Sequence, residues 1–117
     1  MKNQPFSVRV NYAWAGVRAA WHSERSFRIQ GIIALAMCVV MGVLQPALVW
    51  WALVGVMIAL VLAAEMINTA FENLVDHLHP EHHPRIKIVK DCAAAAVLLL
   101  SLSAAWVGVL MVLSVEN

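Results

Sequence analysis

Three long apolar stretches divide the sequence, at residues 29–44, 47–64 and 92–115. A membrane-crossing helix needs about 20 apolar residues, so the first stretch is short and requires tilt or flanking anchorage. Gln45-Pro46 separates the first two stretches, because proline ends a helix and no charge lies there. The second helical pattern continues to about Leu78. The sequence therefore predicts three transmembrane helices, at 29–44, 47–78 and 92–115.

An amphipathic segment precedes these stretches, at residues 6–28. Its apolar residues recur at spacings of three and four and form one stripe on a helix: Phe6, Val10, Ala13, Trp14, Val17, Ala20 and Trp21. A basic helix with tryptophan on its apolar face is typical of the bilayer surface. The alternative is a helix packed in a soluble bundle, which the apolar stretches downstream disfavour. We expect a single all-α membrane domain over residues 1–117, with an N-terminal amphipathic surface helix and three transmembrane helices.

The composition supports a membrane protein. Of the 117 residues, 62% are hydrophobic and only 13% are charged, whereas about 25% would be charged in a soluble domain. The eight Lys and Arg residues form two blocks, one before residue 29 and one within residues 77–91, which we expect to be a polar loop. Three crossings place both blocks on one side, which the positive-inside rule assigns to the cytoplasm. The blocks form no continuous basic surface, so they do not indicate nucleic-acid binding.

Polar side chains gather where the second apolar stretch ends. On a continuing helix, one face within an arc of roughly 100° and over about 16 Å of rise holds Glu65, Asn68, Thr69, Glu72 and Asp76. Carboxylates at the mouth of a membrane helix are costly there and usually mark a functional site. A helix–helix interface or a solvated helix end is the alternative. We favour that alternative for Asp76 alone but not for Glu65, which lies close to hydrocarbon.

The spacing on this face fits phosphoryl transfer. Glu65 and Glu72 lie two turns apart, about 10 Å along the axis, too far to share a proton. One can act as a base while the other holds a metal. Oxygen ligands favour Mg²⁺, which usually arrives with substrate phosphates, and Lys90 with Asp91 adds a cation and a carboxylate at similar depth. Such a set is typical of phosphoryl transfer, although the sequence contains no P-loop or protein-kinase motif.

Two further groups leave alternatives open. Glu24, at the end of the surface helix, is either a second metal ligand or a surface ion pair with Arg25 or Arg28. A small metal-binding membrane protein would use the histidines of the loop for Zn²⁺ or Ni²⁺, namely His77, His79, His82 and His83. Their spacing matches no closed tetrahedral site, which favours a solvated loop that contacts a nucleotide. A third hypothesis is a structural subunit whose polar face docks a partner.

The segment from Glu65 to Asp76 resembles a known signature, E-x-x-N-[ST]-A-x-E-x-x-V-D. This is the signature of the small bacterial integral-membrane lipid kinases, the diacylglycerol kinase and undecaprenol kinase family. The resemblance extends to Lys90-Asp91 and back to Ser23-Glu24-Arg25-Ser26-Phe27-Arg28. It implies a multi-pass kinase of the bacterial inner membrane that uses ATP and Mg²⁺ at the cytoplasmic face. It also implies a homotrimer with composite sites between subunits.

The resemblance implies a role for each matching residue. Glu65 would be the catalytic base that takes the proton of the lipid hydroxyl, supported by Asn68, and Glu24 and Glu72 would hold the metal. ATP would contact Tyr12, Glu24, Glu72, Asp76, Glu81, His82, His83, Lys90 and Asp91. The lipid would enter along the surface helix, past Arg18, Trp21 and Arg28, and reach Glu65.

The lipid itself is less sharply indicated. The segment Ser23–Arg28 and the His-His-Pro of the loop are more similar to the members that prefer undecaprenol. Arg18-Ala-Ala-Trp21 is more similar to the diacylglycerol members, although Gln30 departs from their glutamate. We expect phosphorylation of diacylglycerol to phosphatidic acid, with undecaprenol, giving undecaprenyl phosphate, as the alternative.

Overall fold

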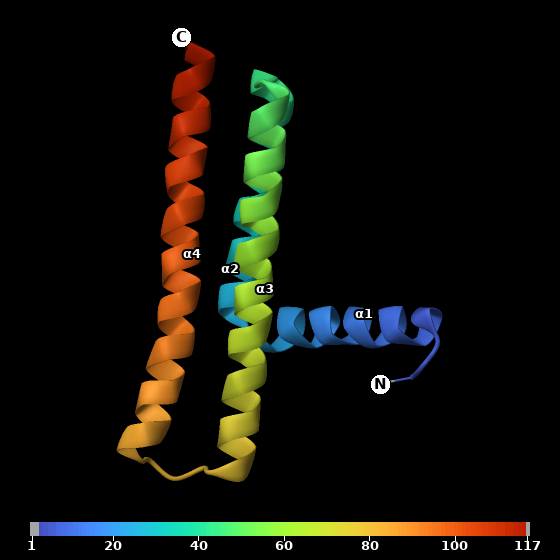
Figure 1. Ribbon diagram of the computed structural model, residues 1–117, viewed down its shortest axis with the longest axis vertical. Helices are drawn as coiled ribbons and strands as arrows, with labels where there is room; N and C mark the ends of the chain where they lie inside the picture. The colour runs from blue at the N-terminus through green and yellow to red at the C-terminus, as the bar shows by residue number, and fades with distance from the viewer. Residues whose placement is uncertain (1–2, 117) are drawn as a thin grey trace.

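The computed structural model describes residues 3–116, which form four helices and no strand. The helices are α1 (Phe6–Ser23), α2 (Arg25–Leu44), α3 (Leu48–Leu78) and α4 (Pro84–Glu116). The last three are long and apolar enough to cross a membrane, and α1 lies crosswise to them (Figure 1). The prediction of an all-α membrane protein with an N-terminal helix and three transmembrane helices is confirmed.

The helix expected over residues 6–28 is broken at Glu24, whose backbone is extended (φ −117°, ψ 109°). Phe27 is buried and packs edge-on against Trp21, with ring centroids 6.4 Å apart. Arg28 Nη1 donates to the carbonyl oxygens of Trp21 (2.7 Å) and His22 (3.2 Å), at the end of α1 where carbonyls lose helical partners. These contacts stabilise a turn whose sequence, residues 21–28, contains no Gly or Pro. The predicted bounds are therefore wrong here, and α2 begins at Arg25 rather than residue 29.

The polar loop expected over residues 77–91 is much shorter in the structure. α3 ends at Leu78 as predicted, but α4 begins at Pro84 and not at residue 92, so only residues 79–83 connect the two helices. Proline is favoured in the first turn of a helix, because its missing N–H would have no partner there. Lys87 and Asp91, hydrogen-bonded at 2.5 Å one turn apart, stabilise this polar beginning of α4.

Gln45-Pro46 forms the tight connector that the sequence predicts. Gln45 adopts the left-handed conformation (φ 50°, ψ 58°) in which many helices end. Its backbone N–H donates to the Met41 carbonyl at 2.8 Å, and its Nε2 donates to the Gly42 carbonyl at 2.8 Å. Two carbonyls of the last turn of α2 are thereby satisfied, and α3 begins at Leu48.

The core of a single copy is small. Met41, Val54 and Met111, one from each of the three long helices, form its buried cluster. Most large apolar side chains lie outside it, as Leu48 (84% exposed) and Val43 (77%) do. A continuous apolar surface of this kind is unstable in water and matches hydrocarbon. Lipid chains or other copies of the chain must therefore cover the three long helices.

Candidate active site

Glu65 is the one buried charged side chain of residues 3–116, with 2% of its surface exposed. Ser26 Oγ donates a hydrogen bond to Glu65 Oε1 at 2.6 Å, across 39 residues of sequence. An unpaired carboxylate would be very unfavourable at such a position, because burial penalises the charged form. This buried, hydrogen-bonded carboxylate is therefore the first candidate for a catalytic group.

The level of Glu65 in the fold follows from its partner. Ser26 is the second residue of α2, directly after the break that sends α1 sideways. In Figure 1, α1 meets the other helices partway along α3, and the α3–α4 hairpin continues well beyond that level. If α1 lies on the bilayer surface, then Glu65 lies at the level of that surface. On that condition, the Glu65 carboxylate lies at the depth of the lipid headgroups.

Asn68 and Glu72 continue the polar face of α3 toward the hairpin loop. Asn68 Nδ2 lies 3.4 Å from Glu72 Oε1, a long hydrogen bond. Asn68 Oδ1 is buried and has no hydrogen-bond partner among residues 3–116. Thr69, also on this face, donates its hydroxyl to the backbone carbonyl of Glu65 at 2.8 Å. An orphaned amide oxygen beside a carboxylate is a suitable pair of ligands for a hard cation such as Mg²⁺.

Glu24 caps the start of α2 by position but makes no side-chain cap hydrogen bond. It is half-buried and forms no ion pair within residues 3–116. The surface ion pair considered from the sequence is therefore not formed, and the carboxylate is free for another partner. Among the same residues, no group of three or more His, Cys, Asp and Glu side chains is placed to hold a metal ion.

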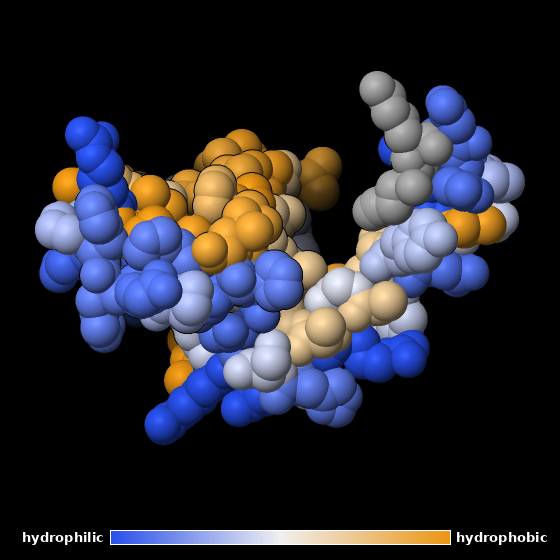
Figure 2. Space-filling model, turned by 90° about the horizontal axis from the view of Figure 1, so that it is seen from below, coloured by the Kyte–Doolittle hydropathy of each residue, from blue (hydrophilic) through white to orange (hydrophobic). Residues whose placement is uncertain are grey.

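A polar pocket of about 570 Å³ lies at the end of the α3–α4 hairpin. Its lining contains six of the residues that the sequence assigns to ATP, namely Asp76, Glu81, His82, His83, Lys90 and Asp91. Lys90 Nζ donates to Asp76 Oδ1 at 2.6 Å, which joins α4 to α3 across the pocket. Figure 2, seen from the hairpin end, shows hydrophilic residues over this end and hydrophobic residues behind them. The pocket is thus set beyond the apolar part of the helices.

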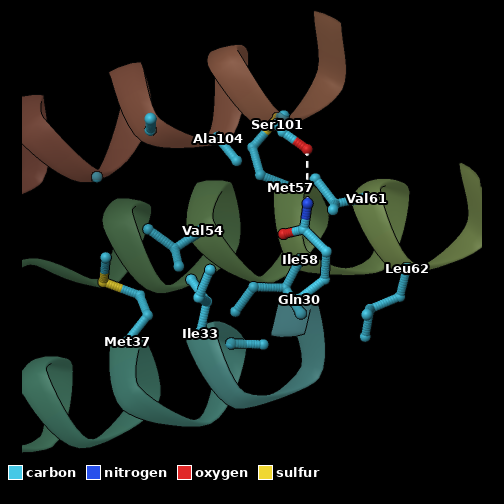
Figure 3. A pocket seen from close by; sticks show the side chains of 13 residues that line it. Gln30, Ile33, Met37, Val54, Met57, Ile58, Val61, Leu62, Ser101 and Ala104 are labelled. Carbon is cyan, nitrogen blue, oxygen red and sulfur yellow. Dashed lines mark hydrogen bonds between the residues drawn. The ribbon is translucent and has the colours of Figure 1, made fainter. Parts of the chain in front are cut away.

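A second cavity, of about 270 Å³, lies among α2, α3 and α4 within the apolar region (Figure 3). Its lining has two polar side chains and no titratable one. Gln30 Nε2 donates to Ser101 Oγ at 2.9 Å and so links α2 to α4. None of the side chains that line this cavity is ionisable, so none could act as a general acid, a general base or a charged metal ligand.

The remaining predicted residues lie on or beside α1. Tyr12 is 47% exposed and outside the hairpin pocket. Arg18 lies over the Trp14 ring at 5.8 Å from its centroid. Trp21 packs on Phe27, and Arg28 is engaged by the carbonyls at the end of α1. Within residues 3–116, none of these four side chains hydrogen-bonds the polar face of α3, and none lines the hairpin pocket.

The role of Ser26 cannot be predicted from the sequence. Its partner is in another helix, so no spacing within one helix could reveal the contact. His79 and Lys87 also line the hairpin pocket without having been assigned to ATP. They lie in the same short segment as the assigned residues, so their proximity could have been inferred.

Comparison with known proteins identifies the family. The sequence model of the prokaryotic diacylglycerol kinase family matches residues 11–112 of this chain. The matched range includes Glu65, the polar face of α3 and the hairpin pocket. The chain belongs to the prokaryotic diacylglycerol kinase family. This membership, together with the missing metal-ligand group in residues 3–116, leaves the histidine-based metal-binding alternative unsupported.

Three relatives illustrate the range of this family. A diacylglycerol kinase of Synechocystis is 38% identical over 102 residues, which cover 86% of this chain and 58% of that protein. A diacylglycerol kinase of Escherichia coli is 34% identical over 90 residues (77% of this chain, 74% of that protein). An undecaprenol kinase of Bacillus subtilis is 28% identical over 102 residues (87% and 83%). The match thus spans less than two thirds of the Synechocystis protein.

Proposed function

We propose that this member of the prokaryotic diacylglycerol kinase family transfers the γ-phosphoryl group of ATP to the hydroxyl of a membrane lipid alcohol. Diacylglycerol, giving phosphatidic acid, is the first candidate, and undecaprenol, giving undecaprenyl phosphate, is the second. The names of the relatives support both lipids. The observation that carries the proposal is the buried Glu65 carboxylate, which Ser26 holds beside the break between α1 and α2.

Glu65 acts as the general base in this proposal. Its carboxylate takes the proton from the lipid hydroxyl as the oxygen attacks the γ-phosphorus of ATP and the bond to ADP breaks. A positioned base contributes about 10²- to 10⁴-fold to such a rate. Only a carboxylate near the bilayer surface can meet both a lipid hydroxyl and a phosphate from the aqueous side. Glu65 satisfies this requirement better than Glu72 or Asp76, which lie further toward the hairpin loop.

The residues present fit Mg²⁺ by their chemistry. Glu72 and Glu24 would hold the ion, and the unpartnered Oδ1 of Asn68 is a third oxygen of the same kind. When bound, Mg²⁺ neutralises charge on the phosphates of ATP. Asn68, by its contact with Glu72, keeps that carboxylate oriented on the polar face of α3.

The hairpin pocket is the proposed nucleotide site. Lys90 supplies a positive charge, and His82, His83 and Glu81 supply hydrogen-bonding groups at the rim. The polar face of α3 runs from Asp76 in this pocket to Glu65 over about 16 Å of helix rise. Phosphates held at the pocket would therefore extend along that face toward the base. Tyr12 would contact the nucleotide from α1, and Asp91 would complete the pocket.

The charges and exposed surfaces around the site suggest the lipid entry, the membrane side and the oligomeric state. Arg18, Trp21 and Arg28 line the entry of the lipid along α1. From the positive residues of both blocks we infer that this end of the protein lies at the cytoplasmic face of a bacterial inner membrane. A homotrimer would cover much of the apolar surface that one copy leaves exposed, and neighbouring subunits would complete each site.

A transfer assay tests the proposal. The purified protein in detergent receives ATP labelled in its γ-phosphate, Mg²⁺, and diacylglycerol or undecaprenol in turn. We expect labelled lipid phosphate from one or both lipids. Glu65→Gln should lower the rate at least 100-fold, whereas Glu116→Gln, at the exposed end of α4, should not change it. Full turnover by Glu65→Gln would contradict the assignment of the base, and no labelled product from the unaltered protein would contradict the lipid kinase itself.

A further inference from the structure

Ser26 is the one side chain that hydrogen-bonds the Glu65 carboxylate within residues 3–116. The donor–acceptor distance of 2.6 Å lies at the short end of the range of O–H···O hydrogen bonds, about 2.5–3.0 Å. Glu65 is 2% exposed, whereas Ser26 lies on the outer side of the contact and is exposed. The hydroxyl therefore covers one oxygen of the carboxylate at the point where α2 begins.

The position of Ser26 in its helix makes this contact unusual. Serine near a helix start commonly satisfies free backbone N–H groups of its own helix. Here the Ser26 hydroxyl instead reaches α3, and Glu24 at the cap position makes no side-chain cap hydrogen bond. Ser23, the last residue of α1, bonds within its own helix, because its hydroxyl donates to the Ala19 carbonyl at 2.8 Å. Two serines beside one helix break thus have different partners.

We propose that Ser26 is a positioning residue for Glu65 and not merely a filler at the helix start. This inference rests on the proposed function, in which Glu65 is the base. The Ser26 hydroxyl holds Oε1 and leaves Oε2 as the oxygen that accepts the proton of the lipid hydroxyl. Within residues 3–116, Oε2 makes no hydrogen bond. Ser26 itself neither gains nor loses a covalent bond in the transfer.

The contact also fixes where the base stands relative to the bilayer surface. Ser26 lies two residues after Glu24, at which the chain turns from α1 into α2. Its hydrogen bond therefore joins the junction of the surface helix directly to the middle of α3. Without it, the Glu65 side chain could rotate away from the proton that it must accept, since a misplaced catalytic group loses rate without losing substrate affinity.

Three variants test the role of Ser26 in the full-length protein. Ser26→Ala removes the donor, and we expect kcat to fall about tenfold, the usual effect of a lost hydrogen bond to a charged group. The KM values for ATP and for the lipid should stay unchanged. Ser26→Thr keeps the hydroxyl at an exposed position and should retain most of the rate. Ser23→Ala removes a matched hydroxyl that does not contact Glu65 and should behave like the unaltered protein.

The outcomes separate the inference from the proposed function. A kcat for Ser26→Ala equal to that of Ser23→Ala would overturn the positioning role while leaving the kinase intact. A raised lipid KM with unchanged kcat would also overturn it, because Ser26 would then be a lipid contact. Failure of Ser26→Thr to restore the rate would show that the hydroxyl is not what matters. If the unaltered protein phosphorylates neither lipid, the proposed function is itself wrong.

Discussion

Lys90 of α4 donates a hydrogen bond to Asp76 of α3 at 2.6 Å, at the edge of the hairpin pocket. The two side chains are 38% and 62% exposed. Exposed ion pairs contribute at most about 1 kcal/mol to stability, because water screens them. The pair therefore matters less for holding the hairpin together than for where it keeps the Lys90 ammonium group, which faces the pocket proposed for ATP.

Replacing Lys90 should weaken ATP binding and leave the fold intact. For Lys90→Met we expect the KM for ATP to rise at least tenfold, about the effect of losing a hydrogen bond to a charged phosphate. The thermal midpoint should move by only a few degrees, since the lost ion pair is exposed. Steady-state kinetics with varied ATP and a thermal unfolding curve provide the two measurements.

Arg85→Met is the matched control for Lys90→Met. Arg85 carries the same charge in the first turn of α4 but does not line the pocket. If both variants raise the KM for ATP equally, the effect comes from general charge at this end of the molecule. The pocket would then not be the nucleotide site.

Removing the charge of Glu72 should raise the requirement for Mg²⁺. Its oxygen makes only a 3.4 Å contact to Asn68, so the carboxylate has capacity for a cation. For Glu72→Gln we expect the Mg²⁺ concentration at half-maximal activity to rise about tenfold or more. Binding of Mn²⁺, followed by electron paramagnetic resonance in the presence of ATP, should weaken in parallel. Equal metal dependence in Glu72→Gln and the unaltered protein would remove Glu72 from the metal site.

Asn68→Ala provides a second measurement on the same cluster. It removes the buried Oδ1 that has no partner, so a direct effect on the metal should weaken Mn²⁺ binding. Loss of rate without loss of Mn²⁺ affinity would instead indicate that Asn68 acts on the base, as the family resemblance implies.

Much of the fold could be predicted from the apolar pattern, because hydrocarbon requires long apolar helices and little else. The three long helices and the Gln45-Pro46 connector follow directly from it. The break at Glu24 could not be predicted, since it depends on how Arg28 and Phe27 contact the end of α1. Both side chains can adopt several rotamers, so their contacts do not follow from the sequence, and no Gly or Pro marks the turn. Pro84 was assigned to the loop, although a proline opens a helix as readily as it ends one.

The candidate site also has a part that the sequence predicts and a part that it does not. The hairpin pocket could be anticipated, because its residues come from one short segment and the adjacent helix ends. The face of Glu65, Asn68 and Glu72 follows from helical geometry alone. The partner of Glu65 could not be found, because Ser26 is 39 residues away in another helix. Contacts between helices depend on packing angles, which one sequence does not specify.

Arg28 should contribute to stability through the end of α1. Its Nη1 satisfies the carbonyls of Trp21 and His22, so Arg28→Leu leaves both without this donor. We expect a loss of about 0.5–1.5 kcal/mol in the free energy of unfolding, because both hydrogen bonds are exposed and water can replace the lost donor; denaturant titration in detergent measures it. Arg25→Leu is the matched control, because Arg25 is exposed and donates no side-chain hydrogen bond within residues 3–116. Equal stability of the two variants would show that the turn does not depend on Arg28.

Gly31 lies close under the Trp21 ring, and this closeness yields the last prediction. A Cβ atom at residue 31 would stand 2.9 Å from Trp21 Cζ3, too near for any side chain. Gly31→Ala must therefore displace the Trp21 ring, and we expect a loss of about 1 kcal/mol in unfolding free energy. Gly42→Ala, in the same helix, meets nothing within 4 Å and should stabilise α2 by up to about 1 kcal/mol. Denaturant titration of both variants measures the difference. A lower unfolding free energy for Gly31→Ala together with a higher one for Gly42→Ala would support the packing of α1 on α2 through Trp21. Equal stability of the two variants would contradict it.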